Sequence, residues 1–366
     1  MTKIKDVTDF LESKAPLAYQ ESYDNAGLIV GNTLEKVKNI LVTLDTTEAV
    51  VEEALAKDCN LIVAHHPIVF KGLKKINGQS YVERTIIKAI KNDVAIYATH
   101  TNLDHVEDGV NFMIAERLAL QNVRILAPKQ NLLTKLVFFV PLVNTQQVLD
   151  TLHQVGVGKI GNYDHCSFKV AGTGTFRPND KARPHIGTNQ VQEEVIENRV
   201  EVIFPTYLEK TVLHTLRRAH PYEEVAYYLT SLQNQNQEVG AGAIGTLTEP
   251  MEAQSFLGYL KQQMNLPIIR HTSLVKETIQ KVAVCGGAGS FLLNDAMGAE
   301  ADVFITADYK YHEFFDADGR IIICDIGHYE SEVFTKELLQ RYLSKKFVNF
   351  ATILSETITN PVNYYV

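Results

Sequence analysis

The stretch Leu61-Ile62-Val63-Ala64-His65-His66-Pro67 decides the fold class of the first part of this 366-residue chain. Its four apolar residues predict a short strand that is buried on both faces, and strands of this kind occur in parallel sheets covered by helices. Similar strands are predicted at residues 40–44 and 94–98. A helical pattern through residues 50–55 lies between the strands at 40–44 and 61–64. We therefore expect an α/β domain built on a parallel sheet.

The same alternation of strands and helices returns in the last third of the chain. Short apolar runs predict strands at residues 282–285, 303–306 and 321–324, and a long helix is predicted after the last of them. Residues 1–130 and 236–366 are therefore expected to be two sequence halves of one α/β domain.

The middle of the chain, residues 131–235, has a different pattern. It contains two successive strand–helix–strand units, separated by a loop rich in Gly, Pro and Asn at residues 172–189. Two such units predict a ferredoxin-like α+β domain with the order βαββαβ, inserted between the halves of the first domain. The polar run at residues 233–237 is interpreted as the linker that leaves this insert.

Composition excludes several classes of protein. The net charge of −8 and the sequence pI of about 5.9 argue against binding to nucleic acid or to an anionic membrane surface. No stretch approaches the roughly 18 uncharged apolar residues that a membrane span requires. The four cysteines are far apart and form no CxxC pair, so we expect free thiols in a cytoplasmic protein.

Five side chains that can bind metal follow the predicted strands. His65 and His66 come directly after one strand, Asp104 closes the segment after the next, and His328 follows a strand of the second half. Glu332 lies one helical turn after His328. Because the carboxyl ends of parallel strands meet at one edge of a sheet, we expect these side chains to converge. Three imidazoles and two carboxylates exceed the usual needs of one ion and predict two divalent ions, with zinc expected and iron, manganese or cobalt as alternatives.

Each of these residues also has a purely structural interpretation. The two adjacent histidines could form a hydrogen-bonded turn, and Asp104 could cap a local turn. His328 and Glu332 could be an ordinary pair at the start of a helix, where the helix dipole favours an acidic residue. The shared placement at strand ends favours the metal site, because unrelated structural roles would not bring all five to one edge.

Other residues near these strand ends have open roles. His100 is a candidate general acid or base, or else a residue that orients a metal ligand. Asp45 either approaches the metal site or helps to start a helix. The segment Gly286-Gly287-Ala288-Gly289-Ser290 connects a strand to a helix and could hold phosphate through its backbone amides, but it lacks the lysine of a P-loop.

Five motifs in the same order resemble the Nif-three-like family, whose bacterial members are commonly labelled GTP cyclohydrolase I type 2 homologues. They are Asp24-Asn25-Ala26-Gly27-Leu28, Ala64-His65-His66-Pro67, His100-Thr101-Asn102-Leu103-Asp104, Cys285-Gly286-Gly287-Ala288-Gly289-Ser290 and Gly327-His328-Tyr329-Glu330-Ser331-Glu332. The resemblance implies a dinuclear metal site with ligands His65, His66, Asp104, His328 and Glu332. It also implies a ring-like homohexamer, a substrate contact at Asp24-Asn25, and a CutA- or PII-like insert in the middle of the chain.

Two classes of function fit these features. The first is a metal-dependent hydrolase, GTP cyclohydrolase-like or phosphoesterase-like, in which a metal-activated water attacks a nucleotide or a related small molecule. The second is a metal-dependent regulatory or binding protein without catalytic turnover. A metal site open to small molecules would favour the first class, and a closed coordination shell would favour the second.

Overall fold

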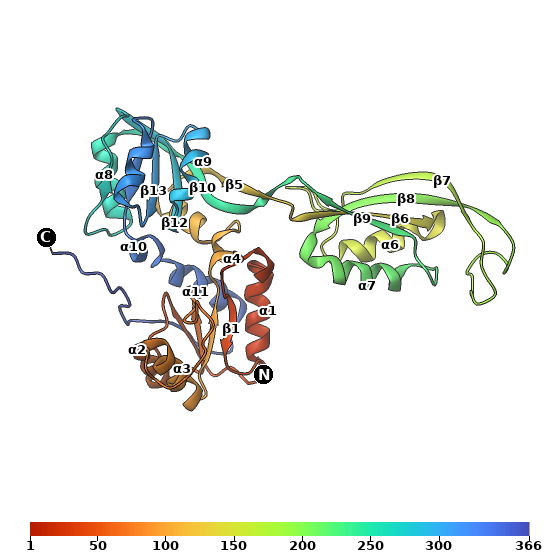
Figure 1. The fold of residues 1–366 in the computed structure, drawn as a ribbon, viewed down its shortest axis with the longest axis horizontal. Coiled ribbons are helices and arrows are strands. Elements are labelled where there is room, and N and C mark those ends of the chain that lie inside the picture. The colour runs from red at the N-terminus through yellow and green to blue at the C-terminus, as the bar shows by residue number, and fades with distance from the viewer. Residues whose placement is uncertain (366) are drawn as a thin grey trace. The chain divides into compact units, whose positions relative to one another are not determined.

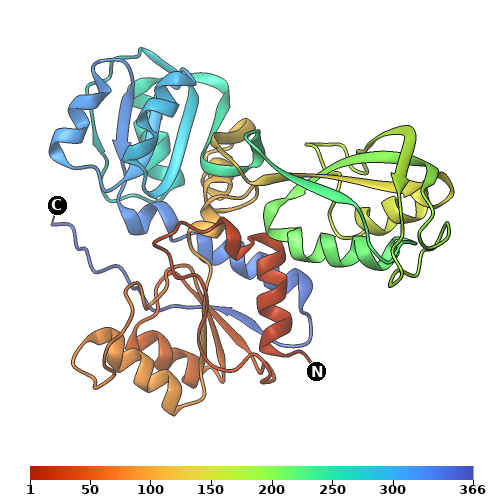
Figure 2. The ribbon, with the colours of Figure 1, turned by 45° about the vertical axis from the view of Figure 1, so that its right-hand side comes forward.

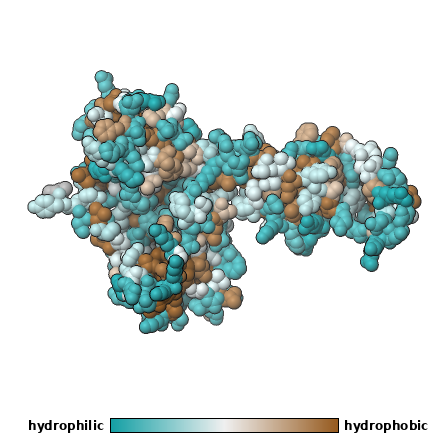
Figure 3. Space-filling view, viewed as in Figure 1, coloured by the Kyte–Doolittle hydropathy of each residue, from teal (hydrophilic) through white to brown (hydrophobic). Residues whose placement is uncertain are grey.

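The computed structural model describes residues 1–365, which divide into two compact units. The main unit consists of residues 1–127 together with residues 239–365, and the insert consists of residues 128–238. Among the described residues, no helix is long and apolar enough to cross a membrane. The visible face of the molecule mixes hydrophilic and hydrophobic residues (Figure 3).

The first half of the main unit is built on a five-stranded sheet with the order β1-β4-β3-β2-β15, whose edge strand β1 is labelled in Figure 1. The last four of these strands are mutually parallel, and β1 is an antiparallel edge strand. The apolar residues of α2 and α3 pack on one face of this sheet in a cluster with Leu41, Ile62 and Ile96. The elements are α1 (Ile4–Lys14), β1 (Gly27–Val30), β2 (Ile40–Thr43), α2 (Glu48–Ala56), β3 (Leu61–Ala64), α3 (Tyr81–Lys91), β4 (Ala95–Ala98), α4 (Thr101–Asp104), α5 (Val110–Arg117) and β15 (Thr352–Leu354).

The second half of the main unit has its own six-stranded sheet with the order β11-β14-β13-β12-β10-β5, visible as a separate layer in Figure 2. Strands β12, β13 and β14 are parallel, and β10 and β11 pair with them in the antiparallel direction. The elements are β5 (Gln121–Gln130), β10 (Gln235–Glu252), α8 (Ala253–Gln263), β11 (Arg270–His271), β12 (Thr278–Ala288), α9 (Leu293–Gly298), β13 (Val303–Ala307), β14 (Ile322–Asp325), α10 (His328–Glu332) and α11 (Thr335–Lys346).

Two helices of the second half link the sheets. Helix α10 follows β14 and contacts β12 and β13, whereas α11 contacts β2 and β15 of the first sheet. Strand β15, which follows α11, then pairs with β2. The polypeptide thus returns to its first sheet after completing the second, which holds the two sequence halves together.

The insert has a four-stranded antiparallel sheet with the order β7-β8-β6-β9 and two helices, α6 and α7, on one face (Figure 1). Leu136, Phe138 and Val140 of β6 point into the core beneath these helices. The order β6-α6-β7-β8-α7-β9 is that of a ferredoxin-like fold. Its elements are β6 (Leu133–Pro141), α6 (Thr145–His153), β7 (Phe168–Phe176), β8 (Glu193–Pro205), α7 (Glu209–Ala219) and β9 (Tyr227–Leu232). Short 3₁₀ segments across the two units occupy Leu17–Tyr19, Leu142–Asn144, Thr206–Leu208, Ser290–Leu292 and Tyr311–Ala317.

The structure corrects several details of the sequence interpretation. The α/β domain has two mixed sheets and not one parallel sheet, because β1, β10 and β11 pair with their neighbours in the antiparallel direction. The expected linker at residues 233–237 overlaps the start of the long strand β10. The single long helix expected after His328 is two helices, interrupted at Val333 and Phe334.

Candidate metal centre

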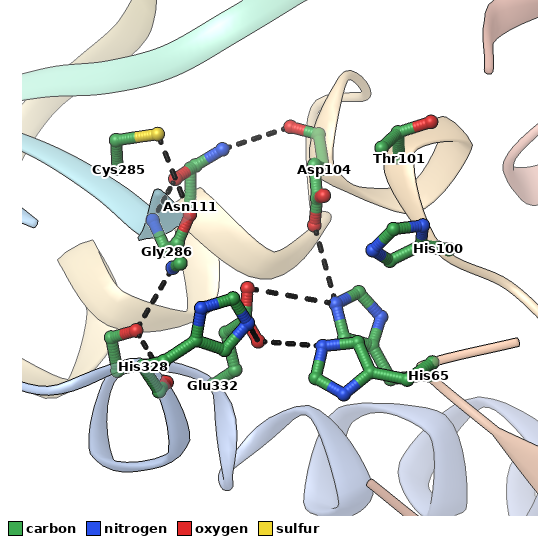
Figure 4. A network of polar contacts seen from close by, with 12 residues as sticks. His65, His100, Thr101, Asp104, Asn111, Cys285, Gly286, His328 and Glu332 are labelled. Atoms are coloured by element: carbon green, nitrogen blue, oxygen red, sulfur yellow. Dashed lines mark hydrogen bonds and ion pairs between the residues drawn. The ribbon is translucent and has the colours of Figure 1, made fainter. Parts of the chain in front are cut away.

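The candidate ligands follow strands of both sheets. His65 and His66 come directly after β3, and Asp104 is the last residue of the short helix α4 after β4. Ala64 and Ala98, the last residues of β3 and β4, are paired in register, so the segments that follow them begin side by side. His328 and Glu332 are the first and last residues of α10. Figure 4 shows all of these segments meeting around one small volume.

Glu332 lies at the centre of the group. One of its carboxylate oxygens, Oε2, is 2.9 Å from Nε2 of His66 and 3.1 Å from Nε2 of His328. The other, Oε1, is 3.9 Å from Nε2 of His65, and that nitrogen is 3.6 Å from Oδ1 of Asp104. The structure therefore brings together all five residues that the sequence singled out as ligands.

Two buried atoms of this group have no hydrogen-bond partner. Nε2 of His65 and Oδ1 of Asp104 are both shielded from solvent and unpaired within the described part of the chain. Buried polar atoms almost always have a partner, since an unpaired one costs about 1–3 kcal/mol. A cation between these two atoms would satisfy both, so the residues present fit a metal ion.

Each of the three imidazoles makes a hydrogen bond through Nδ1, on the side of the ring away from Glu332. Nδ1 of His65 donates to the carbonyl oxygen of Thr99 at 2.8 Å. Nδ1 of His66 is 2.7 Å from the Asp45 carboxylate, and Nδ1 of His328 is 2.7 Å from the Asp308 carboxylate. Metal-binding histidines almost always make such an outer contact, which fixes the ring and leaves Nε2 free to bind. All three Nε2 atoms here point to the Glu332 carboxylate.

The pKa values of the three histidines in the site are strongly shifted from their ordinary value. Burial of His65 lowers its pKa to about 4. Burial would also lower the pKa of His66, but the hydrogen bonds to Asp45 and Glu332 outweigh it and raise that pKa to about 10. In the same way, Glu332 and Asp308 raise the pKa of His328 to about 9 against the effect of burial. The carboxylates of Asp45, Asp308 and Glu332 thus favour positive charge on His66 and His328, whereas burial favours the neutral ring at His65.

His100 lies beside the group and has its own acidic partner. Its Nδ1 is 2.8 Å from the carboxylate of Asp24, which also accepts a hydrogen bond from the backbone nitrogen of Thr101 at 3.0 Å. Burial would raise the pKa of Asp24, but these contacts lower it to about 2. Ligand atoms of His65, His66 and His100 lie within 4.8 Å of one another, and so do those of His66, His328 and Glu332.

A glycine makes room for the central carboxylate. Gly287 has a φ of +62°, and a Cβ added there would lie 2.4 Å from Oε1 of Glu332. Its backbone nitrogen donates to Oγ of Ser331, and the nitrogen of Gly286 donates to Oδ1 of Asn111. These amides are therefore already hydrogen-bonded, so the glycine-rich segment supports the site and does not present these two donors to a phosphate.

A match to a family model covers residues 2–361, and its description is Duf34/NIF3 (NGG1p interacting factor 3). The chain belongs to this family. Among relatives in the family, the GTP cyclohydrolase 1 type 2 homolog of Bacillus subtilis is 38% identical over 98% of both chains. The protein of the same name from Halalkalibacterium halodurans is 37% identical, again over 98% of both chains.

Solved structures support the same family assignment. The Bacillus cereus protein related to NIF3 is 37% identical and superposes with a TM-score of 0.86, covering 100% of this chain and 99% of that one. A Staphylococcus aureus protein at 28% identity gives a TM-score of 0.79 with the same coverage. The resemblance inferred from the five motifs is therefore confirmed.

The roles of three aspartates around the site are only partly predictable from the sequence. For Asp45 the sequence indicates two alternative roles, and in the structure its carboxylate holds the ring of His66. Asp24 was considered a substrate contact, and its side chain is buried against His100. Asp308 was missed, although it directly follows β13, at the carboxyl end of a buried parallel strand where functional side chains gather.

Proposed function

We propose that this protein binds two divalent metal ions through His65, His66, Asp104, His328 and Glu332, and that it is a metal-dependent hydrolase. The observation that carries the proposal is the shared orientation of the three imidazoles. Each ring is fixed through Nδ1, and each Nε2 faces a buried carboxylate. Two bound dications would supply a Lewis acid that activates water and polarises the bond under attack.

A cavity beside the site supports a small-molecule substrate. It has a volume of about 470 Å³, a size typical of ligand pockets, and it is lined on one side by Asp45, His66 and His328. Arg270 also lines this cavity, and its guanidinium forms a 3.1 Å ion pair with Asp325. An arginine here gives the cavity a group that suits an anionic substrate such as a nucleotide. Openness to a ligand favours hydrolysis over a purely regulatory role.

His100 is proposed to move a proton during the reaction. Its ring is 5.3 Å from that of His65 and 5.4 Å from that of His66, centre to centre. Asp24 accepts a hydrogen bond from Nδ1 of His100, which leaves Nε2 of His100 as the ring nitrogen that faces away from the aspartate. A histidine held in this way can act as a general acid or base.

The remaining expectations form part of the same proposal. We infer zinc as the native metal, a homohexameric assembly, a cytoplasmic location and a CutA- or PII-like insert. The ferredoxin-like strand order supports the last of these. Three buried free cysteines, Cys59, Cys285 and Cys324, support a reducing compartment.

The test is metal analysis of the purified protein, followed by a screen for turnover. We expect about two metal ions per chain and hydrolysis of a nucleotide or phosphoester that stops when a chelator removes the metal. His100→Gln should then lower turnover while metal content stays unchanged. Full metal occupancy without turnover on any nucleotide or phosphoester would contradict the hydrolase and favour a binding protein.

A further inference from the structure

A second cavity lies wholly within the insert, on the face of its sheet opposite to the helices. Its volume is about 520 Å³. In β8, Val200, Val202 and Phe204 point into the core under α6 and α7. Glu197 has the opposite parity, so its side chain projects from the other face and lines this cavity.

Glu197 is buried without a counter-charge. The residue is 7% exposed, and its Oε1 has no hydrogen-bond partner within the described part of the chain. Burial raises the pKa of the nearby Tyr222 phenol, and the Glu197 carboxylate adds to this effect, yet Oε1 of Glu197 and the Tyr222 hydroxyl each lack a hydrogen-bond partner within 3.5 Å in the described part of the chain. A Cβ added at Gly174 would lie 2.2 Å from Oε2 of Glu197, so the neighbouring strand leaves space for the carboxylate.

Two basic groups nearby, His220 and Arg177, bond to other partners, and a third, His185, lies with its ring centre 6.1 Å from that of Tyr222. His220 donates from Nε2 to the Phe139 carbonyl at 2.8 Å and accepts at Nδ1 from the backbone nitrogen of Tyr222, an arrangement that requires the neutral ring. Arg177, at the edge of the cavity, is bonded to the backbone and side chain of Gln190. A buried carboxylate without a partner is costly, so these contacts leave a place for a cation from outside the chain.

Aromatic rings form much of the remaining wall. Phe139 and Tyr228 make one edge-to-face pair with ring centres 5.9 Å apart, and Phe176 and Tyr222 make a second pair at 6.3 Å. Aromatic faces attract ammonium and guanidinium groups, and their apolar surface suits a carbon chain. Groups of His, Cys, Asp or Glu with metal-binding spacing occur, among the described residues, only in the main unit. A bare metal ion is therefore a poorer fit than an organic cation.

We propose that this cavity of the insert binds an organic cation, an amine or a guanidinium, with Glu197 as its counter-ion and the two aromatic pairs as its walls. The same chemistry can come from a free small molecule or from a lysine or arginine side chain of another protein chain. The proposal is independent of the metal centre, since none of the candidate metal ligands lies in the insert.

Calorimetric titration of the full-length protein tests the proposal. Putrescine and agmatine serve as probes, and 1,4-butanediol serves as an uncharged match for putrescine. We expect saturable binding of one cation per chain and no binding of the diol. Glu197→Gln should weaken binding by at least about tenfold, as expected for the loss of a buried charge-assisted contact. Absence of saturable binding of both cations, or equal binding of the diol, would overturn the proposal.

Two further variants keep the result interpretable. Glu194→Gln removes an exposed acid from the same strand and should leave binding unchanged. Tyr228→Leu removes one ring from a residue that is 62% exposed, so the fold is not at stake, and it should weaken binding. An unchanged affinity in Glu197→Gln would rule out this carboxylate as the counter-ion.

The molar mass of the protein in solution distinguishes the two possible sources of the cation. If a side chain of another copy fills the cavity, Glu197→Gln or saturating putrescine should reduce the oligomer measured by light scattering. If a free small molecule fills it, the mass should stay constant while binding is lost. Either result accompanied by loss of putrescine binding in Glu197→Gln supports the cation site.

Discussion

At the scale of single residues, Glu332 is the buried carboxylate around which the candidate metal centre is arranged. Its side chain is 4% exposed and faces three imidazole nitrogens. Burial would raise its pKa, but the hydrogen bonds from His328 and His66 and the nearby ring of His65 hold that pKa well below the ordinary value. A carboxylate that stays ionised among imidazoles is suited to offset the charge of bound cations.

The first prediction is that Glu332→Gln reduces metal content from about two ions per chain toward one, with activity falling in parallel. The variant keeps the side-chain shape and deletes the negative charge. Metal titration of the apo variant and apo parent, with a thermal melt of each, measures the effect. Glu337→Gln, at a half-exposed site on α11, is the matched control. A purely structural role of this buried carboxylate predicts a stability loss of about 1–3 kcal/mol, with unchanged metal stoichiometry.

The second prediction concerns Asp308, which holds Nδ1 of His328. Asp308→Asn should lower metal affinity by about 10–100-fold, as loss of an outer partner typically does, without a large loss of stability. Asn tolerates the left-handed backbone at this position, where φ is +58°. Asp318→Asn, at another left-handed aspartate with φ of +46°, is the control. Equal affinity in the two variants would show that Asp308 does not support the ligand.

At the scale of secondary-structure elements, the segment after β15 is anchored to the first half of the main unit through the partly buried carboxylate of Glu53 on α2. Glu53 accepts hydrogen bonds from the hydroxyl groups of Ser355 and Thr357, each at 2.6 Å, and from the backbone nitrogen of Glu356 at 2.8 Å. Burial would raise the pKa of Glu53, but these bonds and the one from Lys57 lower it to about 2. This cluster anchors the segment that leads on to Asn360 and Tyr364 beside the candidate substrate cavity.

The third prediction is that Glu53→Gln lowers the free energy of unfolding by about 1–3 kcal/mol at pH 7. The folded-state pKa is below the ordinary value of 4.5, so the carboxylate stabilises the fold above pH 4.5. That contribution is lost as the pH falls from 4.5 toward 2, and the parent and variant should then converge. Urea unfolding at pH 7 and pH 3 measures both effects. Glu52→Gln, a neighbour that is 64% exposed, should change little at either pH.

Elements with a strong local pattern were predictable from the sequence. The strand at residues 61–64 has the bounds that its apolar pattern indicates, and the insert contains the two strand–helix–strand units that its pattern predicts. Helix α4, with four residues, is too short to show a helical period, so the sequence indicates only that Asp104 closes the segment after a strand. Strand β10 begins in a run of Gln and Asn because its pairing comes from neighbouring strands and not from local preference.

The candidate site was predictable where ligands follow strands, and less so where they depend on packing. Apolar runs before His65 and His328 mark strand ends, so the ligand types and their placement could be inferred. The contact between Asp24 and His100 joins residues that are 76 positions apart, and no local spacing indicates it. The role of Gly287 likewise depends on the position of Glu332 in three dimensions.

At the scale of the whole molecule, the candidate metal centre and the insert are built from separate parts of the chain. The fourth prediction is that a chain lacking residues 131–235, closed by a short flexible linker, folds and binds metal like the parent. The insert has its own core, and the five proposed ligands lie outside it. Circular dichroism and elemental analysis of the shortened protein measure the outcome. A soluble product without metal, or an insoluble one with several linkers, would show that the units depend on each other.

The return of the chain to its first sheet has a consequence for biosynthesis. The contact between His66 and Glu332 spans 266 residues, and β2 receives its neighbour β15 only when residues 352–354 have been made. A ribosome therefore releases the complete insert while the first sheet still has an unpaired edge at β2. Unpaired strand edges promote aggregation. We expect nascent chains that stall before Thr352 to be the species that most need a chaperone, although their insert is already folded.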